Sequence, residues 1–299
     1  MPRRSPFTTL CGRLARLGGP RRADLHVHTT ASDGEFTPTQ VVALARQANL
    51  AAVAVTDHDT LAAIPEAREA AGGRIEVVAG VEITAGFAGR EVHLLGYFVR
   101  TDHAGLNAAL QRLCERRRQR FAEYVAALAA AGLVLPAEAV APVVARSPSL
   151  GRRHLARLLV AARFARHHAE AWHRFLGPLS ARVVPKLLLP VEEAIALVTA
   201  AGGVSALAHP PADLTDDDWR SLAGAGLHAL EADYPARRSG TAARRRELAA
   251  RLGLAVTGGS DCHGPEPLCR RIGSRGITCD EVNAVRERAA QPGSSASRN

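Results

Sequence analysis

The chain has 299 residues, which is enough for one large domain or two modest ones with a substantial buried core. Its formal charge of +9 favours an anionic partner such as a phosphate ester, a nucleotide or a nucleic acid. No uncharged apolar run reaches the roughly 18 residues of a membrane-spanning helix, so no membrane partner is expected.

Residues 1–23 are basic, and Arg13 and Arg16 interrupt the apolar stretch that a secretory signal would need. We interpret this segment as an N-terminal extension, with an organelle transit peptide as the alternative. The five cysteines are odd in number and form no CxxC pair, which argues against a disulfide framework. A reducing, cytoplasmic location is therefore expected.

Residues 24–101 alternate between strand and helix patterns. A helix is expected after Thr37, a suitable N-cap followed by Pro38 at the first helical position. Polar residues follow several of the apolar runs, which is typical of buried parallel strands with functional groups at their ends. The predicted strands are 23–28, 51–60, 75–84 and 91–99, and the predicted helices are 37–50 and 65–73.

Residues 102–180 have few strand signals and are interpreted as a helical insertion. Residues 106–133 predict one long amphipathic helix dense in arginine, and residues 151–177 predict one or two more helices. A solvated face is expected for the arginines of the long helix, with an RNA-backbone groove as the alternative. These arginines are Arg116, Arg117, Arg118 and Arg120.

The alternation of strands and helices returns in residues 181–288, and residues 289–299 are expected to be a disordered tail. The predicted strands are 204–210, 227–234 and 254–264, and the predicted helices are 190–203, 216–226 and 240–253. This pattern is typical of a parallel α/β barrel or an open α/β sheet, in which the ends of the strands form the active site.

Six of the twelve histidines lie at or near the predicted strand ends: His26, His28, His58, His93, His209 and His263. Side chains alternate along a strand, so His26 and His28 face the same side and can bind one ion together. Asp261 and His263 repeat this spacing. A lone histidine at a strand end is usually structural, but six of them in five such motifs favour a metal site.

Imidazole and carboxylate ligands suit zinc, iron or manganese. Two or three such ions held close together can clamp a phosphate and activate water. Glu82 is the natural bridging ligand, because its two oxygens can span two ions. Asp57 and Asp59 are expected to support the ligands or cap a helix rather than bind metal. Cys262 is interpreted as a small buried residue between two ligands.

The segments DLHVHTTASDG, VAVTDHDT, GVEIT, VHLLGY, ALAHP and GGSDCHG occur in this order between residues 24 and 264. Together they resemble the PHP (polymerase and histidinol phosphatase) domain. The resemblance implies an α/β fold, a distorted (β/α)7 barrel with a helical insertion. The barrel would be formed by residues 24–101 and 181–288, with the insertion at 102–180.

The family resemblance also implies a trinuclear site with two to three divalent ions bound. Manganese is the first choice, with iron or zinc as alternatives. The first ion would take His26, His28, Glu82 and Asp261; the second Glu82, His93 and His209; and the third Asp33, His58 and His263. The residues assigned to catalysis are His26, His28, Glu82, Asp261 and His263.

Within the family, the TTASDG loop, TDHDT, GRRHLARLLV and VPKLLLPVEEAI are similar to a bacterial branch that acts on nucleotides. That branch removes the 3′-phosphate of nucleoside 3′,5′-bisphosphates or degrades short RNA from the 5′ end. The resemblance implies that Arg152, His154 and Lys186 bind the substrate phosphate, since Arg and Lys both suit phosphate. A solvated surface is the alternative for Arg152 and Lys186.

The predicted function is therefore metal-dependent hydrolysis of a nucleotide or short RNA. A histidinol-phosphate phosphatase is the first alternative, although the helical insertion and the TTASDG loop count against it. A non-catalytic PHP module that binds nucleic acid is the second, and the complete set of ligands counts against that. The oligomeric state is left open, with a monomer as one option.

Overall fold

The computed structural model describes residues 22–235 and 240–289. The predicted N-terminal extension and C-terminal tail fall almost wholly outside these residues. Within the described part of the chain, no helix combines the length and the apolar character that a membrane span requires.

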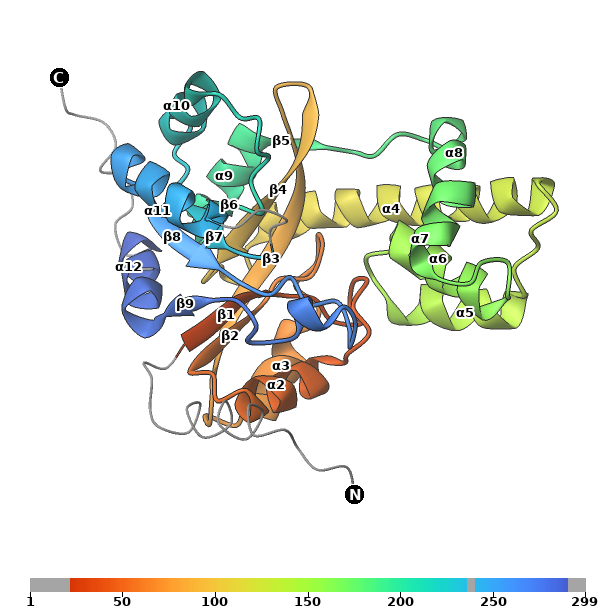
Figure 1. Ribbon diagram of the computed structural model, residues 1–299, viewed down its shortest axis with the longest axis horizontal. Helices are drawn as coiled ribbons and strands as arrows, with labels where there is room; N and C mark the ends of the chain where they lie inside the picture. The colour runs from red at the N-terminus through yellow and green to blue at the C-terminus, as the bar shows by residue number, and fades with distance from the viewer. Residues whose placement is uncertain (1–21, 236–239, 290–299) are drawn as a thin grey trace.

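One nine-stranded sheet forms the centre of the described structure (Figure 1). Its order is β8-β7-β6-β4-β3-β2-β1-β9, with β5 paired to β3. The strands are β1 (Arg22–Val27), β2 (Ala52–Val55), β3 (Glu76–Phe87), β4 (Arg90–Tyr97), β5 (Leu189–Pro190), β6 (Val204–Leu207), β7 (Ala229–Asp233), β8 (Ala255–Gly258) and β9 (Ile277–Thr278).

The segment after β8 returns to β1 and nearly closes the sheet. The backbone amide of Asp261 donates to the carbonyl of His26 at 2.8 Å, and the amide of His28 donates to Cys262 at 3.0 Å. Gly259 permits this approach, because a Cβ at that position would lie 2.4 Å from the Cβ of His26. The predicted distorted barrel is confirmed.

Strand β4 departs from the parallel pairing that the alternating sequence pattern predicts. It runs antiparallel to both β3 and β6, with Thr84 opposite His93. Ala88 and Gly89 have positive φ angles of 48° and 73°, as a two-residue hairpin turn requires. Such a short connection can join only antiparallel strands. His93 therefore enters the site from the middle of a strand rather than from its end.

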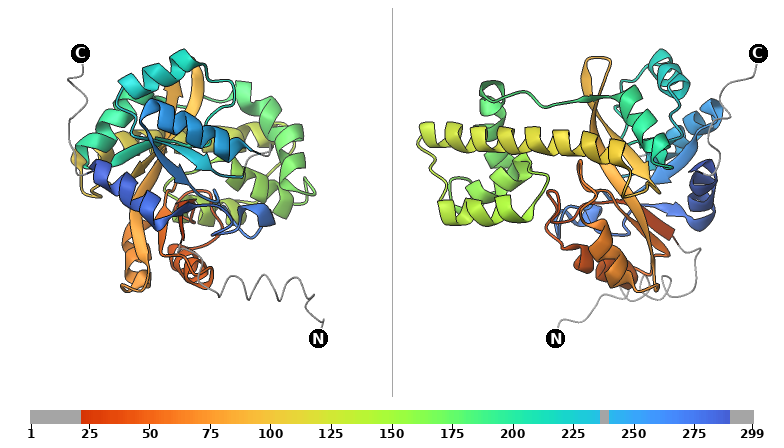
Figure 2. Two further views of the ribbon diagram at one scale, coloured as in Figure 1. Left: turned by 60° about the vertical axis from the view of Figure 1, so that its left-hand side comes forward. Right: turned by 180° about the vertical axis from the view of Figure 1, so that it is seen from behind.

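Helices cover the outside of the sheet, with α2 and α3 on one side and α9 to α12 on another (Figures 1 and 2). Helix α2 begins as predicted, with Thr37 and Gln40 forming a capping box and Pro38 in the first turn. Val41, Val42 and Ala45 of this helix are buried in the core. The bounds are α2 (Pro38–Gln47), α3 (Ile64–Ala71), α9 (Val191–Ala200), α10 (Asp216–Gly224), α11 (Thr241–Leu252) and α12 (Cys279–Ala289).

A block of helices projects from one side of the barrel, with α5 to α8 packed against the distal part of α4 (Figures 1 and 2). It has its own apolar core, which includes Phe121, Tyr124, Leu128 and Leu155. This block corresponds to the predicted helical insertion, whose bounds of 102–180 stay a prediction. Its helices are α4 (Ala104–Ala130), α5 (Ala137–Arg146), α6 (Arg152–Ala161), α7 (His168–Ala171), a π-helical turn (Trp172–Leu176), α8 (Gly177–Leu179) and a 3-10 turn (Ser180–Arg182).

Candidate metal centre and adjoining cavity

Strand β1 delivers the first two histidines of the site. His26 and His28 are fully buried, and their ring centroids lie 5.2 Å apart. Leu25 and Val27 point to the opposite side and pack in apolar clusters. The alternation of the strand therefore brings both imidazoles into one space, as the HxH spacing predicts.

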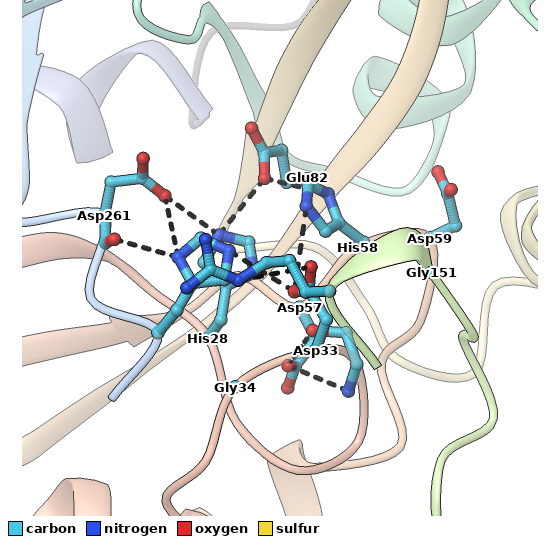
Figure 3. Close-up of polar contacts among 12 residues, drawn as sticks. His28, Asp33, Gly34, Asp57, His58, Asp59, Glu82, Gly151 and Asp261 are labelled. Atoms are coloured by element: carbon cyan, nitrogen blue, oxygen red, sulfur yellow. Dashed lines mark hydrogen bonds and ion pairs between the residues drawn. The ribbon is translucent and has the colours of Figure 1, made fainter. Parts of the chain in front are cut away.

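Glu82 on β3 lies at the centre of the histidine cluster. Its Oε2 atom is 3.2 Å from His28 Nε2, 3.4 Å from His26 Nε2 and 3.0 Å from His58 Nδ1. Figure 3 shows the carboxylates of Glu82 and Asp261 directed toward His28. One carboxylate oxygen thus faces three imidazoles from two separate segments of the chain.

The second oxygen of Glu82 faces a different pair of histidines. Its Oε1 atom is 2.8 Å from Nδ1 of His93 and 3.0 Å from Nε2 of His209. His93 comes from β4, and His209 follows β6 with a positive φ angle of 28°. The two oxygens of Glu82 therefore serve two groups of side chains, which is the arrangement of a bridging carboxylate.

Asp261 lies on the other side of the β1 histidines. Its Oδ1 atom is 3.3 Å from His28 Nε2 and 3.5 Å from His26 Nε2. Its backbone is left-handed, with φ at 51°, a conformation that aspartate tolerates better than most residues. This backbone turns the carboxylate toward Glu82 and the two imidazoles.

A third group lies at the edge of the cluster nearest the helical insertion. Asp33 Oδ1 is 3.3 Å from His263 Nε2 and 3.9 Å from His58 Nε2. The rings of His28 and His263 stack with centroids 4.0 Å apart. All nine predicted ligands are therefore brought into one cluster.

Several buried polar atoms in this cluster have no hydrogen-bond partner among the described residues. They are His26 Nε2, His28 Nδ1 and Nε2, Asp33 Oδ1, His58 Nδ1 and Glu82 Oε2. Such atoms are costly when left unpaired, and most are of the kind that divalent cations take as ligands. Three groups of side chains each have donor atoms that lie within 4.8 Å of one another. They are His28, Asp33, His58 and His263; His26, His28 and Glu82; and His58, Glu82 and His93. The cluster fits divalent metal ions.

Burial and neighbouring charges shift the pKa values in the cluster. Burial alone would lower the pKa of His26, but the charges of Glu231 and Glu82 outweigh it and raise this pKa to about 10. Burial lowers the pKa of His58 and His263 to about 3. Burial would raise the pKa of Glu82, but the surrounding histidines hold it well below its ordinary value. The shifts of Glu82, His58 and His263 favour the ionised carboxylate and the neutral imidazoles that bind metal, whereas an ion would have to displace a proton from His26.

Asp57 supports the loop that carries Asp33. Its carboxylate accepts hydrogen bonds from the backbone amide and hydroxyl of Thr29, both at 2.7 Å, and from the amide of Ser32 at 3.2 Å. Asp59 accepts from the amide and hydroxyl of Thr84 at 2.7 and 2.8 Å. These contacts agree with the supporting role predicted for both aspartates.

A cavity of about 240 Å³ opens beside the cluster, between the barrel and the helical insertion. Arg152 and Lys186, both predicted to bind phosphate, line this cavity. The side chain of Arg152 stacks on Trp172, with 4.6 Å between the guanidinium carbon and the ring centroid. The cluster contributes Asp33, His58, His93 and His263 to the lining.

His154 does not line the cavity, in contrast to the prediction. The residue is only 4% exposed, and its Nδ1 accepts a hydrogen bond from the backbone amide of Gly151 at 3.1 Å. This contact satisfies a backbone amide at the start of α6. The His154 ring therefore holds the start of α6, and its contact with substrate stays a prediction.

Two arginines of α4 do not lie on the solvated face that the sequence predicts for them, so that prediction is wrong for these two. Arg117 donates from Nε to Asp59 at 2.6 Å and from Nη2 to Thr84 Oγ1 at 2.8 Å. Arg120 is buried and donates to the carbonyl of Val184. Both residues line the cavity, whereas Arg118 on the same helix is exposed.

Further charged residues, which the sequence-based prediction did not include, contact the cluster. Glu231 on β7 contacts His26, Glu91 on β4 contacts both His93 and Lys186, and Arg270 forms an ion pair with Asp261. In the sequence, Glu231 and Asp233 are the two carboxylates of the largely apolar run LHALEADY. No comparable local signal marks Glu91 or Arg270.

Comparison with known sequences gives consistent similarities. The PHP domain family model matches residues 24–136. The 5′-3′ exoribonuclease Rnm of Escherichia coli is 33% identical over 252 residues, which cover 82% of this chain and 86% of that protein. A phosphoribosyl 1,2-cyclic phosphate 1,2-diphosphodiesterase of Eggerthella lenta is 33% identical, covering 84% of this chain and 98% of that one. A 3′,5′-nucleoside bisphosphate phosphatase of Chromobacterium violaceum is 29% identical, and the match covers 84% of this chain and 90% of that protein.

Solved structures give the same result. A Bifidobacterium adolescentis structure described as a metal-dependent phosphoesterase superposes with a TM-score of 0.80 at 30% identity, covering 89% of this chain and 96% of that one. A structure described as an amidohydrolase from Chromobacterium violaceum superposes with a TM-score of 0.79 at 26% identity, and the match covers 92% of this chain and 100% of that one.

Proposed function

Because this chain belongs to the PHP domain family of metal-dependent phosphoesterases, we propose that its substrates are phosphate esters of nucleotides. The two reactions we favour are removal of the 3′-phosphate from nucleoside 3′,5′-bisphosphates and 5′-to-3′ cleavage of short RNA. Relatives named for each of these activities cover more than four fifths of the chain.

The cationic cavity next to the histidine cluster is the observation that carries this proposal. Arg117, Arg152 and Lys186 line it together with His58 and His93 of the cluster. A substrate with two phosphates can place one at the cluster and the other among the basic side chains. Arginine suits a bidentate phosphate contact, and lysine supplies a compact charge.

The same charges argue against histidinol phosphate as the substrate. That molecule carries one phosphate, and its other end is an amine and an imidazole. With its phosphate at the cluster, its cationic end would face the guanidinium of Arg152, whereas the ammonium of Lys186 is paired with Glu91 of the same cavity lining. Like charges brought together in a partly buried cavity repel each other.

We assign the metal ions to the nine clustered side chains, with Glu82 as the bridge between groups. Manganese is the first choice, and iron or zinc would suit the same donors. Bound ions would activate water and neutralise charge on the phosphate oxygens. The assigned ligands are His26, His28, Asp33, His58, Glu82, His93, His209, Asp261 and His263.

Residues that line the cavity would bind and orient the rest of the substrate. Arg152 and Lys186 orient the second phosphate, while Trp172 holds the Arg152 guanidinium in place and offers an apolar surface for a base. Arg117 is held by Asp59 and lies beside Thr84, so its charge is fixed at the wall of the cavity. The odd cysteine count supports the cytoplasm as the working compartment.

A direct test is product release by purified protein with added Mn²⁺. The substrates to compare are adenosine 3′,5′-bisphosphate, a short 5′-phosphorylated RNA, phosphoribosyl 1,2-cyclic phosphate and histidinol phosphate. Asp261→Ala serves as the inactive control, and Asp213→Ala as a matched control at an exposed carboxylate. We expect metal-dependent turnover of the bisphosphate or the RNA, lost only in Asp261→Ala. Turnover confined to the cyclic phosphate or to histidinol phosphate would overturn the assignment to nucleotides.

A further inference from the structure

Glu231 on β7 is a buried carboxylate directly behind the histidine cluster. It has no exposed surface, and its Oε1 atom lies 2.9 Å from Nδ1 of His26. Its Oε2 atom accepts a hydrogen bond from the backbone amide of His209 at 2.6 Å. One carboxylate thus contacts two of the residues assigned to metal binding, one on each side of Glu82.

The contact with His26 decides which ring nitrogen faces the cluster. Beside a carboxylate, Nδ1 carries the proton and donates it in a hydrogen bond. When a metal ion displaces the second proton of the ring, the other nitrogen, Nε2, offers its lone pair to that ion. That atom lies 3.4 Å from Glu82 Oε2 and 3.5 Å from Asp261 Oδ1, and it has no hydrogen-bond partner among the described residues.

The contact with His209 fixes a strained stretch of backbone. His209 has a φ angle of 28°, which is unfavourable for a residue with a side chain. Strands β6 and β7 pair with Leu207 opposite Leu230, so Glu231 is next to the segment that carries His209. The hydrogen bond to the backbone amide holds this segment where the His209 ring reaches Glu82.

No lysine or arginine among the described residues pairs with the charge of Glu231. Among the residues that the structure describes, His26 is the only side chain within ion-pair distance of it. A buried carboxylate is costly without a compensating charge. A cation shared by His26 and its neighbours would provide that compensation.

We propose that Glu231 is a positioning residue for the metal centre, which sets the tautomer of His26 and the backbone of His209. This inference rests on the metal site assigned above and not on the identity of the substrate. Partners of this kind behind a ligating histidine commonly change metal affinity 10- to 100-fold when removed.

Glu231→Gln is the sharpest variant because it keeps size and shape. The contacts with His26 Nδ1 and the His209 amide use different oxygens of Glu231, and a glutamine would place an amide NH₂ group at one of these two positions. Glu281→Gln is the matched control, because it removes a carboxylate that is hydrogen-bonded to the Thr278 amide and paired with Arg246. Both variants lose one negative charge, and only the first touches the cluster.

The measurement is Mn²⁺ binding by titration calorimetry, with ion content after desalting determined by mass spectrometry. We expect affinity on the order of 10- to 100-fold weaker in Glu231→Gln, with partial recovery of turnover at high Mn²⁺. Glu281→Gln should bind as the wild type does. Unchanged affinity and ion content in a folded Glu231→Gln protein would overturn the proposal.

A second measurement needs no Glu231 variant and covers the case in which Glu231→Gln does not fold. In wild-type protein loaded with Zn²⁺ and labelled with ¹⁵N-histidine, the His26 signals are assigned by their loss in His26→Gln. We expect a protonated Nδ1 and a Zn²⁺-bound Nε2, and the reverse would overturn the proposal. If the wild-type protein binds ions but does not hydrolyse nucleotides, the substrate assignment fails while the role proposed for Glu231 is unaffected.

Discussion

Arg117 on the helical insertion donates from Nε to the buried carboxylate of Asp59 on the barrel, over 2.6 Å. Two further contacts, to Thr84 Oγ1 at 2.8 Å and to the Leu150 carbonyl at 3.4 Å, surround the same guanidinium. The insertion is therefore joined to the barrel by a charged group beside the metal cluster. Helix α4 does more than lie on the surface, because it forms a wall of the active-site cavity.

Arg117→Ala should destabilise the protein strongly, since it leaves Asp59 buried without its cation. Removing one partner of a buried ion pair costs about 3 kcal/mol or more. The check is the free energy of unfolding from urea denaturation, with Arg118→Ala as the control on the exposed side of the same helix. Equal stability of the two variants would show that the ion pair does not hold the insertion.

Lys186→Ala and Arg152→Ala should weaken catalysis selectively toward substrates with a second phosphate. A hydrogen bond to a charged group contributes about 1.5–3 kcal/mol, which corresponds to a loss of roughly 10- to 100-fold in kcat/KM. The comparison is adenosine 3′,5′-bisphosphate against adenosine 3′-monophosphate. Arg112→Ala, at an exposed arginine of α4, is the control. Equal losses on both substrates would place these side chains at the reacting phosphate instead.

The clustering of the histidines was predictable from the sequence because the signals for it are local. His26 and His28 share a face through strand alternation, and Asp261 and His263 follow a buried strand. Each pattern can be recognised within ten residues. Where the barrel departs from simple alternation, at β4, the antiparallel turn at Ala88 and Gly89 is equally local but was not part of the prediction.

The supporting contacts could not be predicted, because they join residues far apart in the chain. Arg117 and Asp59 are separated by 58 positions, and His26 and Glu231 by 205. An arginine on an amphipathic helix looks the same in sequence whether it faces solvent or a buried carboxylate. Only the packing of the insertion against the barrel distinguishes the two cases.

Glu82→Gln should remove more metal than His93→Gln does. Glu82 contributes to two of the three groups of donor atoms, whereas His93 contributes to one. Replacing one carboxylate oxygen by an amide nitrogen removes a ligand and adds a donor that faces the imidazoles. Ion content per chain, measured after equilibration with Mn²⁺, tests the order. His103→Gln, at the N-cap of α4, is the control, and the opposite order of loss would contradict a bridging Glu82.

His154 lies outside the nine clustered residues and gives the protein a further sensitivity to acid. Burial lowers its pKa from 6.5 to about 4, and its Nδ1 must stay unprotonated to accept from the Gly151 amide. The folded state therefore binds fewer protons than the unfolded state between these two values. The stability that this group contributes is complete above pH 6.5 and is lost as the pH falls toward 4.

His154→Gln should remove this dependence, because a glutamine at the same helix position can accept from the Gly151 amide without titrating. A pKa shift of this size corresponds to up to about 3 kcal/mol. The measurement is the free energy of unfolding of both proteins at several pH values between 4 and 8, at one fixed Mn²⁺ concentration. The wild type should lose stability relative to His154→Gln as the pH falls through the window. Parallel curves for the two proteins would mean that His154 keeps its ordinary pKa and does not hold the start of α6 through a neutral ring.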